Sequence, residues 1–265
     1  MPQPILSVLI PAFEAEKTIH RAVESVLSEP SVEVVITPDD GTHTYKDLEV
    51  EYAGRVKVLA PSLRIGPGKA RNRAFEASVG TFITMLDCDD YFGPGALREA
   101  LDLARNSPAK IAFFRTVYIH DETGVVCREL PLSPTLDFQT FMDFHGSIHA
   151  LYRRDRWRPY SGHRISQDVL FDANLLAACD GVAPLTRAPH FKTLHPKSVT
   201  SKSDQHDFDA EYRLVIENAA QLWIKRLFRE KLRMGELYGQ LRSAGSMLSF
   251  HEFMRQRGAG EIPAD

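Results

Sequence analysis

Three aspartates gather in the short segment Asp87-Cys88-Asp89-Asp90, directly after an apolar run. Residues two apart along a strand share a face, so Asp87 and Asp89 at a strand end can point into one pocket while Cys88 turns toward the core. Two carboxylates aimed together repel each other unless a cation joins them, and hard oxygen ligands suit Mg²⁺ or Mn²⁺. Such cations are commonly shared with substrate phosphates, so the segment points to a metal-bound diphosphate.

The same segment also has a purely structural explanation. Aspartates are common in turns and at the first positions of helices, and Asp89 or Asp90 could simply lead into the helix that Pro94 opens. Short motifs match by chance, so the acidic segment alone leaves both interpretations open.

The elements around this segment alternate between strand-like and helix-like patterns over the first 120 residues. This alternation predicts an α/β domain with a mostly parallel sheet. Compact apolar runs predict strands at 5–10, 32–36, 56–59, 81–86 and 111–119, and helical spacing of apolar residues predicts helices at 19–27, from Gly66-Pro67-Gly68 to Gly80, and after Pro94. The strand at 81–86 therefore delivers the chain into the acidic segment.

Composition excludes several classes of protein. A hydrophobic fraction of 43% and a formal charge of -3 indicate an ordinary globular protein with no general attraction for nucleic acid. Three cysteines without CxxC spacing argue against structural zinc and a disulfide framework. Without an export signal or a run of 18 apolar residues in the sequence, we expect a cytoplasmic protein.

Order and spacing across the first half favour the chemical interpretation of the acidic segment. The blocks SVLIPAF at 7–13, EVVITPDDGT at 33–42, GKARN at 68–72 and GTFITMLDCDD at 80–90 closely resemble the family 2 inverting glycosyltransferases of GT-A fold. The resemblance covers residues 5–120 well, weakens to about 200 and is absent beyond. It implies a catalytic domain over 1–206, with a nucleotide-sugar-binding half at 1–120 and an acceptor-binding half at 121–206, followed by a helical extension at 207–265.

The resemblance also implies a donor site for a UDP- or GDP-sugar. In that family the end of the first strand and the Asp-Asp-Gly turn hold the base and the ribose, and Asp40 is our candidate for the base contact because a carboxylate accepts from a nucleobase N–H. The implied nucleotide-sugar contacts are Pro11, Ala12, Phe13, Glu14, Asp39, Asp40, Gly68, Arg71, Asp87 and Cys88. A tight turn at 39–41 and a solvated helix residue at 71 are the alternatives.

Two positions depart from the family pattern beside the nucleotide pocket. The usual Tyr-Asn after the first strand is Phe13-Glu14 here, and Thr37-Pro38 makes the approach to the Asp-Asp turn atypical. These departures leave the donor nucleotide open.

Metal and base assignments follow from the same resemblance. Asp89 and Asp87 are the expected ligands of Mn²⁺ or Mg²⁺, and His195 in the LHPKS run is a weaker candidate ligand. Asp168 in SQDVLFDANLL, at 166–176, is the candidate general base, whereas a helix-start carboxylate behind a Ser166 cap is the structural alternative. His149 is expected in the acceptor pocket or in a structural role.

The resulting hypothesis is a metal-dependent inverting glycosyltransferase that acts on a glycan or lipid-linked acceptor in bacterial polysaccharide, lipopolysaccharide or glycolipid synthesis. A sugar nucleotidyltransferase and a non-catalytic nucleotide-binding protein of the same fold are the alternatives. In the extension, Val215, Ile216, Ala219, Leu222, Trp223 and Leu227 form an apolar stripe beside several cations. We expect this stripe to pack on the domain or form a homodimer, with peripheral contact at the inner membrane as the alternative.

Overall fold

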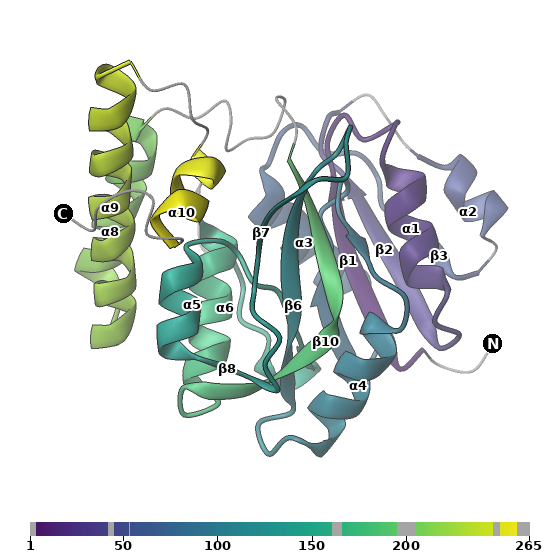
Figure 1. Ribbon diagram of the computed structural model, residues 1–265. Helices are drawn as coiled ribbons and strands as arrows, with labels where there is room; N and C mark the ends of the chain where they lie inside the picture. Colours follow the sequence, from purple (N-terminus) through teal and green to yellow (C-terminus); the bar gives the residue numbers. More distant parts are fainter. Residues whose placement is uncertain are drawn as a thin grey trace.

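The computed structural model describes residues 4–41, 45–52, 54–160, 166–194, 205–245 and 250–258. A ten-stranded sheet with helices on both faces forms its centre (Figure 1). The strands are β1 (Leu6–Ala12), β2 (Val32–Pro38), β3 (Val56–Val58), β4 (Phe82–Met85), β5 (Tyr91–Phe92), β6 (Ile111–His120), β7 (Val126–Glu129), β8 (Thr135–Asp137), β9 (Ala150–Arg153) and β10 (Val182–Leu194). The helices are α1 (Ile19–Leu27), α2 (Asp47–Glu51), α3 (Pro67–Ala77), α4 (Ala96–Asn106), α5 (Phe138–Phe144), α6 (Gln167–Ala177), α8 (Gln205–Asn218), α9 (Leu222–Ser243) and α10 (Phe250–Gly258), with a 3-10 turn at Arg154–Arg156.

Strand order follows the path β3-β2-β1-β4-β9-β6-β10-β5, with β7 added to β6 and β8 to β10. The N-terminal strands β3, β2, β1 and β4 pair in parallel, as do β6 and β10. Strand β9 runs antiparallel to both β4 and β6, and so joins the two parallel groups. The predicted α/β fold with a central, largely parallel sheet is confirmed.

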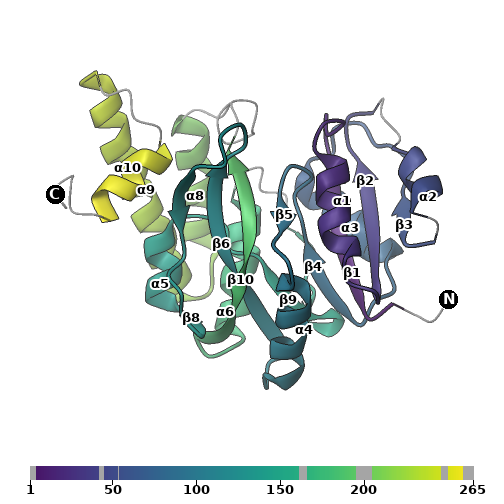
Figure 2. The same cartoon turned by 45° about the vertical axis from the view of Figure 1, so that its right-hand side comes forward.

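Helices cover the two faces of the sheet because each strand alternates its side chains between two apolar cores. Val8 and Ile10 of β1 belong to the core beneath α1 and α4. Leu9, between them, belongs to the core beneath α3, α6 and α9. The views in Figures 1 and 2 show these two layers on opposite sides of the sheet. Both faces of β1 are buried, which explains its uninterrupted apolar sequence.

The carboxyl ends of β1, β2 and β4 meet at one edge of the sheet. Ala12 is in register with Pro38, and the Asp39 N–H donates to the Ala12 carbonyl at 2.7 Å. Polar segments that follow these strands therefore emerge side by side, which is the usual place for a ligand in an open α/β sheet.

The C-terminal segment differs from the single predicted stripe. The helix breaks after Asn218 and restarts at Leu222, because Gln221 adopts an extended conformation. This break changes the helical phase, so Leu222 is 82% exposed whereas Val215 and Leu227 are buried. Helices α8 and α9 both contribute to the core that also contains residues of α5 and α6. This agrees with the expected packing of the extension on the domain.

Within the described residues, no helix is both long and apolar enough to cross a membrane.

We predict that Gly80→Ala lowers the free energy of unfolding by about 1–3 kcal/mol. A Cβ at Gly80 would lie 2.5 Å from Ser7 Oγ and 2.6 Å from the Ser7 nitrogen, where Gly80 N–H now donates to Ser7 Oγ and that hydroxyl donates to Glu33. Gly239→Ala is the matched control, because a Cβ in this part of α9 meets nothing within 4 Å and Ala favours a helix. Urea denaturation measures both, and an unchanged midpoint for Gly80→Ala would contradict the close packing.

Candidate active site

The acidic segment forms a turn immediately after β4. The strand ends at Met85, and the Asp90 N–H donates to the Asp87 carbonyl at 3.0 Å. A turn and not a strand therefore aims the carboxylates, while Cys88 packs against the core as expected. This turn is fixed from outside, because the Asp89 carbonyl accepts from Arg21 Nη2 and from Thr193 Oγ1, both at 2.8 Å.

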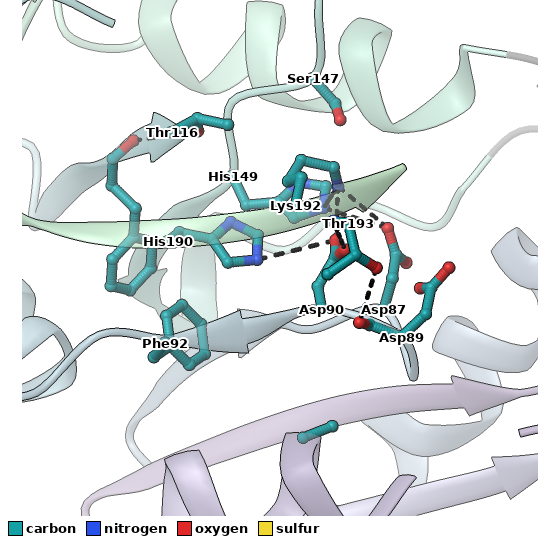
Figure 3. A network of polar contacts seen from close by, with 12 residues as sticks. Asp87, Asp89, Asp90, Phe92, Thr116, Ser147, His149, His190, Lys192 and Thr193 are labelled. Carbon is teal, nitrogen blue, oxygen red and sulfur yellow. Dashed lines mark hydrogen bonds and ion pairs between the residues drawn. The ribbon is translucent and has the colours of Figure 1, made fainter. Parts of the chain in front are cut away.

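A buried lysine lies at the centre of the acidic turn. Lys192 of β10 places Nζ 3.1 Å from Asp87 Oδ2, 3.1 Å from Asp90 Oδ2 and 3.2 Å from His149 Nε2. Figure 3 shows the Lys192 side chain between the two carboxylates, with the Asp89 carboxylate pointing away from this network. Burial lowers the pKa of Lys192, but the charges of Asp90 and Asp87 outweigh it, so the pKa lies well above its usual value.

A second cation holds the other oxygen of Asp87. Arg71 of α3 is 3% exposed, and its Nη2 lies 2.5 Å from Asp87 Oδ1. Burial raises the pKa of Asp87, but Lys192 and Arg71 outweigh it and hold this pKa well below its usual value. The Arg71 guanidinium also lies over the Tyr160 ring, 5.3 Å from its centroid. Arg71 therefore orders Asp87 instead of lying exposed on the helix surface.

Asp90 has a structural environment. It is 2% exposed, and its Oδ1 accepts from the Thr193 N–H at 2.8 Å, so it joins the turn to β10. Burial raises the pKa of Asp90 to about 7, although Lys192 opposes the shift. The carboxyl thus contributes to holding the turn in place.

A histidine and another aspartate extend the network into the core. His149, at the start of β9, lies with Nδ1 3.1 Å from Asp172 Oδ2 of α6. Burial and the charge of Lys192 lower the pKa of His149, but its contacts with Asp172 and Asp87 outweigh them and raise this pKa above its usual value. Burial raises the pKa of Asp172 to about 6. This chain of contacts connects the acidic turn to α6.

Asp168 lies on the first turn of α6, beside the same network. Burial raises the pKa of its carboxyl, but the charges of His149, Arg71 and Lys192 outweigh burial and lower it. Asp168 is therefore ionised at neutral pH. The predicted Ser166 cap, which belonged to the structural alternative for Asp168, is not formed. Ser166 has a φ of 55° and makes no side-chain cap hydrogen bond. Its hydroxyl lies 3.4 Å from Tyr212 Oη of α8 instead.

The two aspartates after β2 have different environments. Asp39 is 5% exposed, and its carboxylate accepts from the N–H groups of Ile65 and Gly66 at 2.7 and 2.8 Å. These bonds hold the loop that begins α3. The neighbouring Asp40 is half-buried and accepts from Tyr45 Oη at 3.0 Å. Asp39 is thus committed to the fold, whereas Asp40 lies nearer the surface.

The remaining predicted donor residues lie at the end of β1, at the start of α3 and in the acidic turn. Pro11 and Ala12 are buried in β1, whereas Phe13 and Glu14 are exposed just beyond it, with Arg64 over the Phe13 ring at 5.3 Å. Gly68 packs against α6, since a Cβ there would lie 1.9 Å from Gln167 Oε1. Burial raises the pKa of the Cys88 thiol far above its usual value, so this cysteine is unreactive.

The divalent cation can be tested against the side chains present. Both oxygens of Asp87 are engaged by cations, and no group of three His, Cys, Asp or Glu side chains suited to a metal occurs in the described part of the chain. Asp89 is the carboxylate that points away from the ion pairs (Figure 3). One carboxylate suits an ion that is held mainly by substrate phosphates. His195 lies outside the described residues.

Sequence reasoning missed the cation that organises the turn. Lys192 and His190 stand two apart on β10 and share a face, and both approach Asp90, with His190 Nε2 at 3.8 Å. Burial lowers the pKa of His190 well below its usual value, so this ring is neutral. The available signal was the spacing of two between His190 and Lys192, which places both side chains on one face of a strand. This spacing does not reveal that β10 ends beside the turn after β4.

Comparison with known proteins gives a consistent result. The family model described as glycosyl transferase family 2 matches residues 7–161. The chain is 33% identical over 157 residues to the succinoglycan biosynthesis protein ExoU of Rhizobium meliloti (strain 1021), covering 55% of this chain and 44% of the relative. It is 30% identical over 302 residues to the putative glycosyltransferase EpsH of Bacillus subtilis (strain 168), covering 100% of this chain and 85% of that protein.

A solved structure shows the same fold. S. aureus TarS 1–349 in complex with UDP-GlcNAc matches with a TM-score of 0.63 at 20% identity, over 86% of this chain and 71% of that one. The chain spans less than half the length of ExoU, so its similarity to that relative concerns one part of a longer protein.

We predict that Lys192→Met lowers the free energy of unfolding by about 3 kcal/mol or more at pH 8, and by less at pH 5. Without the ammonium, the pKa of buried Asp90 rises further above its unfolded value, so stability falls as pH rises through that interval. Wild-type Lys192 stays charged across this range. Urea denaturation at the two pH values measures the effect.

The double variant Lys192→Met/Asp90→Asn is the control, since it removes both buried charges and should recover part of the loss. An equal loss of stability at both pH values would contradict the charge pairing.

Proposed function

Because the chain belongs to glycosyltransferase family 2, we propose that it transfers a sugar from a nucleoside-diphosphate sugar to a hydroxyl group with inversion of configuration. The observation that carries this proposal is an ionised carboxylate, Asp168, held at the start of α6 beside a turn that presents Asp87 and Asp89. These are the parts that such a transfer requires: a base and a donor-binding turn.

Asp168 is the proposed general base. It takes the proton of the acceptor hydroxyl while that oxygen attacks the anomeric carbon, and the bond from that carbon to the diphosphate oxygen breaks. The nucleoside diphosphate leaves with the bonding electrons. The lowered pKa of Asp168 supports this role, because the carboxylate is unprotonated before the attack.

The donor nucleotide is proposed to bind at the carboxyl ends of β1 and β2. Asp40 suits the base contact better than Asp39, whose oxygens already accept two backbone N–H groups. Exposed Phe13 and Glu14 offer the adjoining surface, over buried Pro11 and Ala12. Asp87 would contact the ribose, with Arg71 fixing its direction, and the Gly68 and Cys88 backbones complete the proposed wall.

A divalent cation, Mn²⁺ or Mg²⁺, is proposed to bind Asp89 together with the donor diphosphate, and to neutralise the charge of the leaving group. The involvement of Asp87 as a direct ligand is disfavoured by its two ion pairs. Asp89 faces away from those pairs, which supports its assignment as the carboxylate ligand.

The proposed acceptor is a glycan or a lipid-linked saccharide. Peripheral contact with a membrane or a second copy through α8 and α9 is a further proposal. The apolar residues Leu227 and Phe228 are buried in the core and do not serve it. Such a contact would use exposed Leu222 with the exposed cation Arg226.

We predict that Asp168→Asn lowers kcat by about 10²–10⁴-fold, since loss of a general base removes that factor. Binding of UDP or GDP should stay within about twofold, because the nucleotide lies on the other side of the acidic turn. Release of free nucleoside diphosphate from the sugar donor measures turnover, and release of pyrophosphate would instead indicate nucleotidyl transfer.

Asp180→Asn is the matched control, an exposed aspartate just beyond the far end of α6. Full turnover by Asp168→Asn would overturn the proposed mechanism.

We predict that Asp89→Ala abolishes the enhancement of UDP or GDP affinity by Mn²⁺, whereas wild-type protein binds the nucleotide at least about tenfold more tightly with the metal. Titration calorimetry with and without Mn²⁺ measures this difference. Asp102→Ala, an exposed carboxylate of α4, is the control. Equal metal dependence in Asp89→Ala and wild type would refute the ligand assignment.

A further inference from the structure

Two cations that the proposed reaction does not use, half-buried Arg128 and buried Lys231, converge on one turn. Arg128 of β7 and Lys231 of α9 both approach the His145-Gly146 turn that follows α5. Lys231 Nζ donates to the His145 carbonyl at 2.9 Å. A Cβ built at Gly146 would lie 2.8 Å from Arg128 Nη2, so the guanidinium passes directly over this glycine. Helix α9 thereby places a positive charge against the half of the domain that is predicted to bind the acceptor.

Across the described residues, no Asp or Glu forms an ion pair with Arg128 or Lys231. Asp168 acts on Lys231 through its charge without forming an ion pair with it. Arg128 Nε and Nη1 are buried and have no hydrogen-bond partner in that same part of the chain. The guanidinium lies 4.9 Å from the Tyr118 ring centroid and 4.7 Å from that of Phe144. The guanidinium also hydrogen-bonds to the Tyr118 side chain. Aromatic rings attract a cation, but they do not satisfy its in-plane Nε–H and Nη1–H groups.

This arrangement is costly without a ligand. Burial lowers the pKa of Arg128, and burial together with the charge of Arg128 lowers the pKa of Lys231 to about 8. Removing a cation from water without a partner is unfavourable, so two of them at one turn indicate that an anion completes the site. Lys192 offers the contrast, since its carboxylate partners raise its pKa.

The position of the pair identifies which substrate would bring the anion. Ser166, two residues before Asp168, places its hydroxyl 3.4 Å from Tyr212 Oη of α8, and the Tyr212 ring lies 5.5 Å from that of Phe228, three residues before Lys231 on α9. The pair therefore lies on the side of the proposed base, in agreement with the action of the Asp168 charge on Lys231. Strand β7 and helices α5 and α9 lie on the opposite side of β6 from β1 and β2, where the nucleotide is proposed to bind (Figures 1 and 2). The acceptor, not the donor, therefore reaches Arg128 and Lys231.

We propose that Arg128 and Lys231 form a binding site for a phosphate or carboxylate group of the acceptor, close to the hydroxyl that Asp168 deprotonates. The acceptor class is thus an anionic saccharide or a phosphorylated one. Arg128 offers a planar pair of N–H donors that suits either oxyanion, and Lys231 supplies a second charge. The identification of the ligand as an acceptor rests on the proposed transferase activity, whereas the anion site itself does not.

Direct binding of inorganic phosphate and of D-glucuronate tests the site without turnover. Titration at constant ionic strength should show saturable binding to wild-type protein. Lys231→Gln removes the charge while its amide can still donate to the His145 carbonyl, so the fold is preserved and phosphate affinity should fall more than about tenfold. Lys231→Arg should retain binding, and Arg226→Gln, an exposed cation on the same helix, should behave as wild type.

UDP affinity, measured on the same variants, identifies the source of the anion. Unchanged UDP affinity in Lys231→Gln supports an acceptor site, whereas a parallel loss of UDP affinity would assign the anion to the donor diphosphate and overturn the proposal. Absence of phosphate and glucuronate binding to wild type, or equal binding to Lys231→Gln, would also overturn it. Failure of the transferase assay alone would leave these binding results intact and would count against the proposed function instead.

Discussion

The ion pairs of Lys192 aim the carboxylates of the acidic turn. Strands β4 and β10 are separated in the sheet by β9 and β6, but β5, which follows the turn directly, pairs antiparallel with β10. Lys192 adds side-chain contacts to this pairing through Asp87 and Asp90, and the Thr193 N–H donates to Asp90. Such a buried pairing is specific in geometry, since removal of one partner leaves a charge without compensation. The direction of Asp89 follows from the turn that these contacts hold.

A second constraint fixes the proposed base against the donor side. Gly68 near the start of α3 packs against Gln167 at the start of α6, an approach that a side chain at 68 would prevent. Arg71 lies one turn along α3 and holds Asp87, whereas Asp168 follows Gln167 directly. The two helices therefore hold Arg71 and the proposed base Asp168 close to each other, and the glycine of the GKARN block has a packing function.

Local patterns predicted the architecture well because strands and helices of an α/β domain are encoded by periodicity within short windows. The parallel group around β1 followed from such patterns, and the resemblance together with the residues around Asp168 predicted its place at the start of a helix, where the structure has it. The role of Lys192 could not be predicted in this way, since it depends on the register of β10 against β6, where Lys192 lies opposite Tyr118. The prediction of a Ser166 cap was wrong for a related reason. Its backbone adopts a left-handed conformation, and its hydroxyl contacts a residue 46 positions away.

The same dependence on distant partners explains why equally buried lysines have opposite properties in this fold. Carboxylates of the acidic turn compensate Lys192, so it stays charged and acts as a permanent part of the structure. Lys231 meets a carbonyl and another cation, and burial and the charge of Arg128 lower its pKa to about 8, although Asp168 opposes the shift. An ionic ligand adds little stabilisation to a group whose charge is already compensated within the fold. It stabilises an uncompensated charge most. Charge balance thus separates the cations that shape the site from those available to bind a substrate.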